Sequence, residues 1–210
     1  MPSLTDLALG LVTVYLVWRL RRGGEVVTHW RAALVWAAGT ALAGAVYHGV
    51  LVGIPRVTAL SWAITSVMVV VVVSYVLAAS VVQVLGRRRV VVFWLLRSVG
   101  LVAYVVLAAA GHASIAAIMW CESLTMASVV GLWIWAWGRR HPMAGPMLVA
   151  IGASVAAAML RLVPGAAALA GLDPDSGYHV GQIGAMVLLY HAVARSGRQP
   201  PAAAPLISTG

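Results

Sequence analysis

The sequence predicts an all-α integral membrane protein with seven transmembrane helices, its N-terminus outside and its C-terminus in the cytoplasm. Hydrophobic residues make up 62% of the 210 residues and charged residues only 9%. The mean hydropathy is +0.97. A soluble domain of this length cannot bury so much apolar surface, so the surrounding solvent must be lipid. Apolar runs of roughly 20 residues, the length that crosses a bilayer, recur along the chain, and arginines cluster between them.

Seven such runs follow one another with short connections, and each is expected to be helical because unsatisfied backbone is prohibitive in lipid. They are Leu4–Leu20, Arg31–Val52, Val57–Leu85, Val90–Gly111, Ser114–Trp137, Pro146–Val163 and Pro174–Ala194. Residues 1–196 are therefore predicted to form one bundle with no second domain. The Pro/Ala-rich tail, residues 197–210, is predicted to be disordered.

Individual features support these runs in order. The first is followed by "RLRR", which indicates a retained span with a stop-transfer flank. The fourth and fifth carry Arg97 and Glu122 at similar predicted depth, so we expect a buried ion pair that braces adjacent helices. The seventh begins with Asp173, a good N-cap, and Pro174, which suits the first helical position.

The distribution of charge predicts the direction of the spans. Arginines occupy the first, third and fifth connections and the end of the chain: Arg19, Arg21, Arg22, Arg31, Arg87, Arg88, Arg89, Arg139, Arg140, Arg195 and Arg198. The alternate connections hold only Arg56, then no charge, then Asp173 and Asp175. By the positive-inside rule the first set of connections is cytoplasmic.

Composition also excludes several classes of function. All 14 basic side chains are arginine, so a retinal Schiff base on lysine is excluded. The net charge of +9 is explained by orientation charges at the membrane surface, and no nucleic-acid partner is expected. The one cysteine, Cys121, allows no intramolecular disulfide and is expected to be a small buried hydrophobe.

Polar side chains from distant parts of the sequence are predicted to lie at one level just below the outer surface. A rise of about 1.5 Å per residue places five groups there. They are Asp6, His48, His112, Asp175 and His179. Charged and polar groups at this depth are costly and usually functional.

Three of these groups have the chemistry of metal ligands. Asp175 and His179 are spaced i, i+4 and share one helix face. With His48 from the second helix they would form a three-ligand zinc site with one open position. Such a site lowers the pKa of a bound water towards 7. Asp6 is then the candidate general base and His112 a candidate partner of the ligands.

Several stretches also resemble the CREST superfamily of alkaline ceramidases, progestin/adipoQ-type receptors and hemolysin III proteins. They are "AGAVYHGV" in the second run and "DSGYHVGQIGAMVLLYHA" in the seventh, with "LTDLALGLVTVYLVWRL" and "LSWAITSV" resembling uncharacterised seven-span members. The resemblance implies a seven-helix zinc-dependent hydrolase of lipid amides. It implies that His48 and His179 are zinc ligands and that Asp175 replaces the first histidine of an H-x-x-x-H pair.

The chain departs from that family pattern at two positions. The serine expected four residues before the second-helix histidine is Gly44, and the third helix has no aspartate. These losses remove the groups that would stabilise an oxyanion and transfer protons.

Three hypotheses on function remain open. The first is a membrane-embedded metal-dependent hydrolase that acts on a lipid-like amide or ester at the outer face. The second is a non-catalytic accessory or structural subunit that binds membrane protein partners in a larger complex. The third is a b-type haem protein with two of His48, His112 and His179 as axial ligands.

Overall fold

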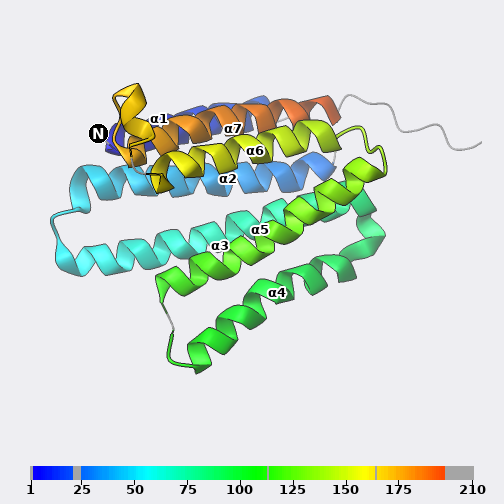
Figure 1. The fold of residues 1–210 in the computed structure, drawn as a ribbon, viewed down its shortest axis with the longest axis horizontal. Coiled ribbons are helices and arrows are strands. Elements are labelled where there is room, and N and C mark those ends of the chain that lie inside the picture. Colours follow the sequence, from blue (N-terminus) through cyan, green and yellow to red (C-terminus); the bar gives the residue numbers. More distant parts are fainter. Residues whose placement is uncertain (1, 21–24, 113, 164, 197–210) are drawn as a thin grey trace, which may run out of the picture.

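The computed structural model describes residues 2–20, 25–112, 114–163 and 165–196, which form seven long helices (Figure 1). The helices are α1 (Pro2–Arg19), α2 (Glu25–Val46), α3 (Pro55–Leu85), α4 (Val90–Ala109), α5 (Ile115–Gly138), α6 (Ala144–Leu162) and α7 (Pro174–Ser196). Short segments η1 (Tyr47–Leu51), η2 (Arg87–Arg89) and η3 (Ala167–Ala170) lie between them. The all-α class is thus confirmed, and the predicted tail, residues 197–210, lies outside the described residues.

The helix boundaries follow the predicted runs closely, with one larger difference. The second helix begins at Glu25 and not at Arg31. Its additional first turns are stabilised by burial, since Val27 and Trp30 are only 5% and 1% exposed. The apolar run alone does not mark this start, because the helix extends past the segment that a bilayer would require.

Five of the described helical segments are long and apolar enough to cross a membrane. They are Val27–Leu51, Leu60–Leu85, Arg87–Ala109, Ala116–Gly138 and Ala144–Leu162. The helices outside this set, α1 and α7, are the ones that carry Asp6, Asp175 and His179. The polar residues that make these two helices less apolar are therefore the residues that the sequence singles out for chemistry.

The helices form a bundle in which α4 is the outermost element (Figure 1). Helices α1, α2, α6 and α7 lie side by side, α3 and α5 pack beneath them, and α4 packs against α3 and α5. Large apolar side chains on α4 are exposed, among them Trp94 (61%), Leu95 (62%) and Val102 (59%). Surfaces of this kind are rare on soluble monomers and fit contact with lipid.

The hydrophobic core is concentrated in one half of the bundle. Trp30, Leu77, Val129, Trp133 and Val193 are buried there, in the half that the arginine pattern predicts to be cytoplasmic. Both tryptophans also satisfy their indole N–H groups: Trp30 donates to Gln83 Oε1 (2.8 Å) and Trp133 donates to Ser80 Oγ (3.0 Å). These bonds satisfy the polar groups that the large aromatic side chains bring into this core.

The predicted pair between α4 and α5 is present in the structure. Arg97 donates from one terminal nitrogen to Glu122 Oε1 at 3.0 Å and from the other to Thr125 Oγ1 at 3.1 Å. Both charged side chains are buried, with 4% and 7% of their side-chain surface exposed. The pair links the outermost helix to the rest of the bundle, as the sequence predicts.

Candidate functional site

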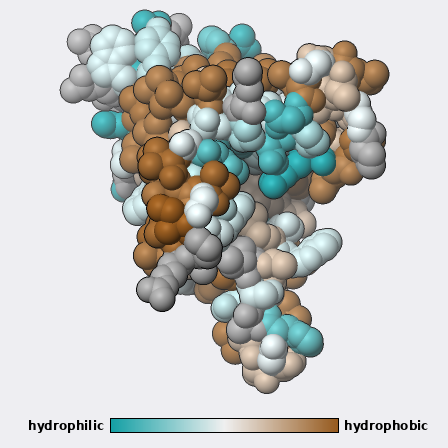
Figure 2. Space-filling view, turned by 90° about the vertical axis from the view of Figure 1, so that its left-hand side faces the viewer, coloured by the Kyte–Doolittle hydropathy of each residue, from teal (hydrophilic) through white to brown (hydrophobic). Residues whose placement is uncertain are grey.

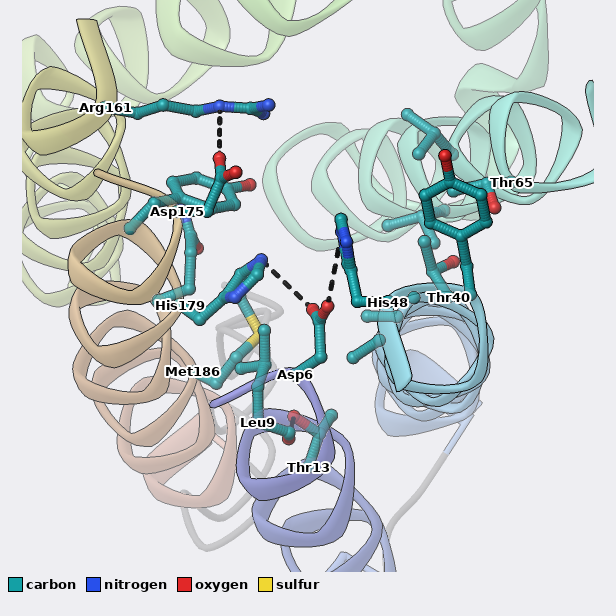
Figure 3. Close-up of a pocket in the computed structure, with 18 of the residues that line it drawn as sticks. Asp6, Leu9, Thr13, Thr40, His48, Thr65, Arg161, Asp175, His179 and Met186 are labelled. Atoms are coloured by element: carbon teal, nitrogen blue, oxygen red, sulfur yellow. Dashed lines mark hydrogen bonds and ion pairs between the residues drawn. The ribbon is translucent and has the colours of Figure 1, made fainter. Parts of the chain in front are cut away.

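Asp6 lies in the second turn of α1 and is buried, with 5% of its surface exposed. Its carboxylate stands between two imidazoles from other helices (Figure 3). Asp6 Oδ1 is 3.0 Å from His179 Nε2, and Asp6 Oδ2 is 3.9 Å from His48 Nε2. Three predicted site residues from α1, η1 and α7 thus meet at one point, as their common depth in the sequence suggests.

His48 projects from a π-helical segment, η1 (Tyr47–Leu51), which continues α2. Segments with i→i+5 hydrogen bonds are rare and occur frequently at functional sites. The ring of Tyr47 lies edge-on to the His48 ring, with centroids 5.0 Å apart. Sequence reasoning treated this segment as ordinary α-helix, and no feature of "YHGVL" would have predicted the change in winding.

Gly44 makes room for the Asp6 carboxylate. A Cβ atom built on Gly44 would lie 3.0 Å from Asp6 Oδ2 and 3.2 Å from the carboxyl carbon. This is closer than ordinary van der Waals contact, so a side chain at this position would press on the carboxylate. The absence of the expected serine at Gly44 is thereby explained in physical terms, because the carboxylate of Asp6 occupies the adjacent space.

His179 is oriented by close contacts at both ring nitrogens. Its Nδ1 is 3.1 Å from Thr5 Oγ1, while the Thr5 hydroxyl donates to the Pro2 carbonyl at 2.9 Å. The Thr5 oxygen is therefore placed to accept from Nδ1–H, which assigns the proton of the neutral ring to Nδ1. The Nε2 atom then faces Asp6, and a proton can pass between these two groups. Thr5 was not predicted, although it directly precedes Asp6.

A cavity of about 350 Å³ opens beside this cluster. Asp6, His48 and His179 line its polar part, while Leu9, Val69, Val72 and Met186 line its apolar part. Figure 2 views the end of the molecule at which the cluster lies and shows a hydrophilic patch set among hydrophobic residues. A pocket that is mostly apolar with a few convergent polar groups is typical of a small-molecule site.

Asp175 has a different partner from the one that the sequence predicts. Its Oδ1 accepts from Arg161 Nε at 2.8 Å, across the gap between the end of α6 and the start of α7 (Figure 3). It lines the same cavity as His179 but pairs with a cation. Asp6, which was predicted to be a base, is the carboxylate that both imidazoles face. The predicted metal set of His48, Asp175 and His179 is therefore not assembled in this arrangement.

The described side chains also form no other metal-binding group. Throughout the described ranges, no group of three or more His, Cys, Asp or Glu side chains is arranged so that it could hold a metal ion. The donor chemistry of Asp6, His48 and His179 suits zinc, which accepts carboxylate oxygen and imidazole nitrogen. Their present arrangement is that of a carboxylate facing two imidazoles, 3.0 Å from His179 Nε2 and 3.9 Å from His48 Nε2.

Asp173 begins α7 as predicted. Ser176 donates to it twice, from its backbone N–H to Oδ1 (2.9 Å) and from its hydroxyl to Oδ2 (2.6 Å). These two hydrogen bonds lower the pKa of the Asp173 carboxyl from its usual 3.8 to about 2. The cap fixes the first turn of α7 and so helps to set the position of His179 two turns later.

His112 does not join the cluster. It lies in the connection between α4 and α5, is exposed, and is not among the residues that line the cavity. Its backbone N–H donates to the Leu107 carbonyl (2.8 Å) at the end of α4. Helix α4 lies at the edge of the bundle, so a residue at its end is displaced sideways from the site. The haem hypothesis gains no support from this placement.

Comparison with known proteins gives one result. No curated protein and no solved structure matches the chain. A family model does match, over residues 1–198, and its description is "Family of unknown function (DUF6962)". Because the match covers nearly the whole chain, the protein belongs to the DUF6962 family.

Proposed function

We propose that this protein is a membrane-embedded hydrolase that cleaves a lipid-like amide or ester at the outer face of the cell membrane. The proposal includes seven crossings, with the N-terminus outside and the C-terminus in the cytoplasm. It is supported by five apolar helices of sufficient length and by arginines that gather in alternate connections. The observation that carries it is a buried carboxylate placed between two imidazoles beside an amphipathic pocket.

The cluster supplies the acid–base chemistry that hydrolysis needs. A water molecule beside Asp6 and His179 gives up a proton to this pair as its oxygen attacks the substrate carbonyl. The bond from the carbonyl carbon to the leaving nitrogen or oxygen then breaks, and the leaving atom takes that proton. In this proposal His48, which lines the pocket, donates to the oxyanion that develops on the carbonyl.

No step of the proposed hydrolysis uses a zinc ion. Asp6, His48 and His179 have donor atoms that suit zinc, but in their present arrangement they form no group that could hold a metal ion. A bound zinc ion would supply a water of lowered pKa and would polarise the carbonyl. Its presence is a matter for metal analysis of the purified protein.

Hydrolysis of defined lipids tests the proposal. The protein in phosphatidylcholine nanodiscs is supplied with long-chain N-acyl amides and monoacyl esters, and released fatty acid is measured. We expect release by the wild type and a loss of about 100-fold or more in Asp6→Asn and His179→Gln, since a positioned acid–base group contributes at least this much. His112→Gln, outside the pocket, is the matched control.

Two outcomes would contradict the proposal or its metal. Equal rates in wild type and Asp6→Asn, or no release of fatty acid from any lipid, would remove the hydrolase. If a stoichiometric membrane protein also co-purifies, the accessory-subunit alternative takes its place. Equal zinc content in wild type, His48→Ala and His179→Ala, or none in any of them, would remove zinc.

A further inference from the structure

We propose that the pocket takes an amphiphile with an anionic headgroup, phosphate or carboxylate, and that the guanidinium of Arg161 recognises this headgroup. The inference rests on the proposed function for the position of the reacting carbonyl. It adds the class of substrate and assigns a specificity role to Arg161.

The side chain of Arg161 reaches over the pocket from the last turn of α6. Its Nε atom lies 2.8 Å from Asp175 Oδ1, and its guanidinium end extends past this pair toward the centre of the pocket (Figure 3). Within the part of the chain that the structure describes, Asp175 is the one carboxylate that forms an ion pair with Arg161. The side chain is 53% exposed, so its terminal nitrogens are accessible to a ligand.

This mode of pairing orients the arginine for a second anion. A guanidinium is a planar fork whose donors match the oxygens of a carboxylate or phosphate. Asp175 takes the Nε–H group and restrains the plane of the fork, which leaves the two terminal nitrogens for a ligand. Asp175 is itself held in the first turn of α7, where the helix dipole favours a carboxylate.

One arginine and two carboxylates line the pocket, and the arginine is the group that can bind an anion. Two carboxylates line the cavity, and both are engaged: Asp175 with Arg161, and Asp6 with the two imidazoles. Arg161 is the lining residue that carries a fixed positive charge with donors still available. A cationic headgroup would meet this guanidinium at the mouth of the pocket and be repelled.

The spacing along α7 fits a headgroup, a carbonyl and a tail in that order. His179 follows Asp175 by one turn, about 6 Å deeper along the helix axis. Met186 lies two further turns along the same helix and joins Val69 and Val72 in the apolar part of the cavity. A headgroup on Arg161 therefore places a nearby carbonyl at the level of Asp6 and directs an alkyl chain into the apolar part.

Binding of three matched probes tests the inference without turnover. The protein in phosphatidylcholine nanodiscs is titrated with dodecyl phosphate, dodecanol and inorganic phosphate, and binding is followed by the shift in thermal midpoint. We expect wild type to bind dodecyl phosphate at least about tenfold more tightly than either other probe, since hydrogen bonds to a charged group are worth a factor of this size. Dodecanol tests the tail alone, and inorganic phosphate tests the headgroup alone.

Variants of Arg161 test whether this residue causes the preference for dodecyl phosphate. Arg161→Gln is expected to lose about tenfold in affinity for dodecyl phosphate, and Arg161→Lys, which keeps the charge but not the fork, is expected to lose less. Arg140→Gln changes an exposed arginine in the connection between α5 and α6 and should bind as wild type does. Unchanged preference in Arg161→Gln would overturn the inference.

If a variant fails to fold, the affinities of the wild type for the three probes still test the inference. Equal affinity for dodecanol and dodecyl phosphate would overturn the anionic headgroup, and inorganic phosphate that binds as tightly as dodecyl phosphate would overturn the amphiphile. Retained preference without hydrolysis of any lipid would overturn the proposed function and leave this inference standing. Hydrolysis of lipids without a preference for dodecyl phosphate would overturn this inference and leave the proposed function standing.

Discussion

The carboxylate of Asp6 is surrounded by groups that leave it little freedom. His179 Nε2 lies 3.0 Å from one oxygen, and the backbone of α2 passes close to the other at Gly44. His179 is in turn restrained by Thr5. Each contact comes from a different helix or turn, so the position of the carboxylate depends on tertiary packing. A site of this kind is sensitive to small changes in volume.

Gly44→Ala tests that sensitivity. The new Cβ atom would lie 3.0 Å from Asp6 Oδ2, so the carboxylate must move away from His48. We expect lipid hydrolysis to fall severalfold, because the carboxylate must shift by a few tenths of an ångström and a misplacement of about 1 Å at a reacting group costs about 100-fold. Thermal stability should change little, since Ala suits a helix better than Gly.

Gly152→Ala is the matched control for this change. It adds the same methyl group within a helix, at a position with no neighbouring atom within 4 Å. It should leave hydrolysis unaltered. Equal activity in Gly44→Ala and Gly152→Ala would show that the Asp6 carboxylate does not need its observed position.

Asp173 gives a prediction on pH. Its folded-state pKa of about 2 lies below the usual 3.8, so its contribution to stability is present above 3.8 and is lost as pH falls toward 2. Asp173→Ala should cost about 1 kcal/mol at neutral pH, the typical value of an N-cap. Thermal midpoints of wild type and variant, measured from pH 7 to pH 2, should converge at the acid end. A gap that stays constant with pH would contradict the account.

At the scale of elements, the sequence predicted all seven helices but not what lies between and beside them. Hydropathy and helical length identify spans because lipid permits few alternatives for the backbone. The π-helical η1 and the sideways position of α4 depend on packing between helices, which hydropathy does not describe. For this reason the predicted depths of Asp6, His48 and His179 correctly indicated that these residues meet. The same predicted depth wrongly placed His112 with them.

The ion pair that joins α4 to α5 should be costly to break on one side. Arg97→Met leaves Glu122 buried without its cation, and we expect a loss of about 3–5 kcal/mol in stability. Arg97→Met combined with Glu122→Leu removes both charges and should recover most of that loss. Thermal or denaturant unfolding of the purified protein measures both variants. A double variant as unstable as the single one would contradict the view that the cost comes from the unpaired charge.

At the scale of the whole molecule, the two ends of the bundle differ in what they bury. The end rich in arginine contains buried tryptophans with satisfied indole groups, and the opposite end contains the polar cluster, its cavity and the Arg161–Asp175 pair. The arginine pattern predicts which end faces the cytoplasm, and the metal set was predicted from the spacing of its residues and from the resemblance to a hydrolase superfamily. The sequence could not predict that Asp6 and not Asp175 faces the histidines. That outcome depends on Arg161, which extends from α6 and pairs with Asp175.

The proposed orientation predicts which end reacts with an impermeant reagent. Cys121 is 2% exposed and is replaced by serine to remove the native thiol. Leu169→Cys, at a position in η3 that is 93% exposed and lies in the connection between α6 and α7, should then react with a membrane-impermeant maleimide in right-side-out vesicles. Arg140→Cys should react only after the vesicles are opened. The opposite pattern would place the site on the cytoplasmic side.

The central claim is that Asp6 and His179 act together as one hydrolytic unit, and a double-mutant cycle in lipid hydrolysis tests it most directly. Groups that act as a unit are strongly non-additive, so the Asp6→Asn/His179→Gln double variant should be about as slow as the slower single variant. Losses that simply multiply in the double variant, or single variants as fast as wild type, would contradict the claim.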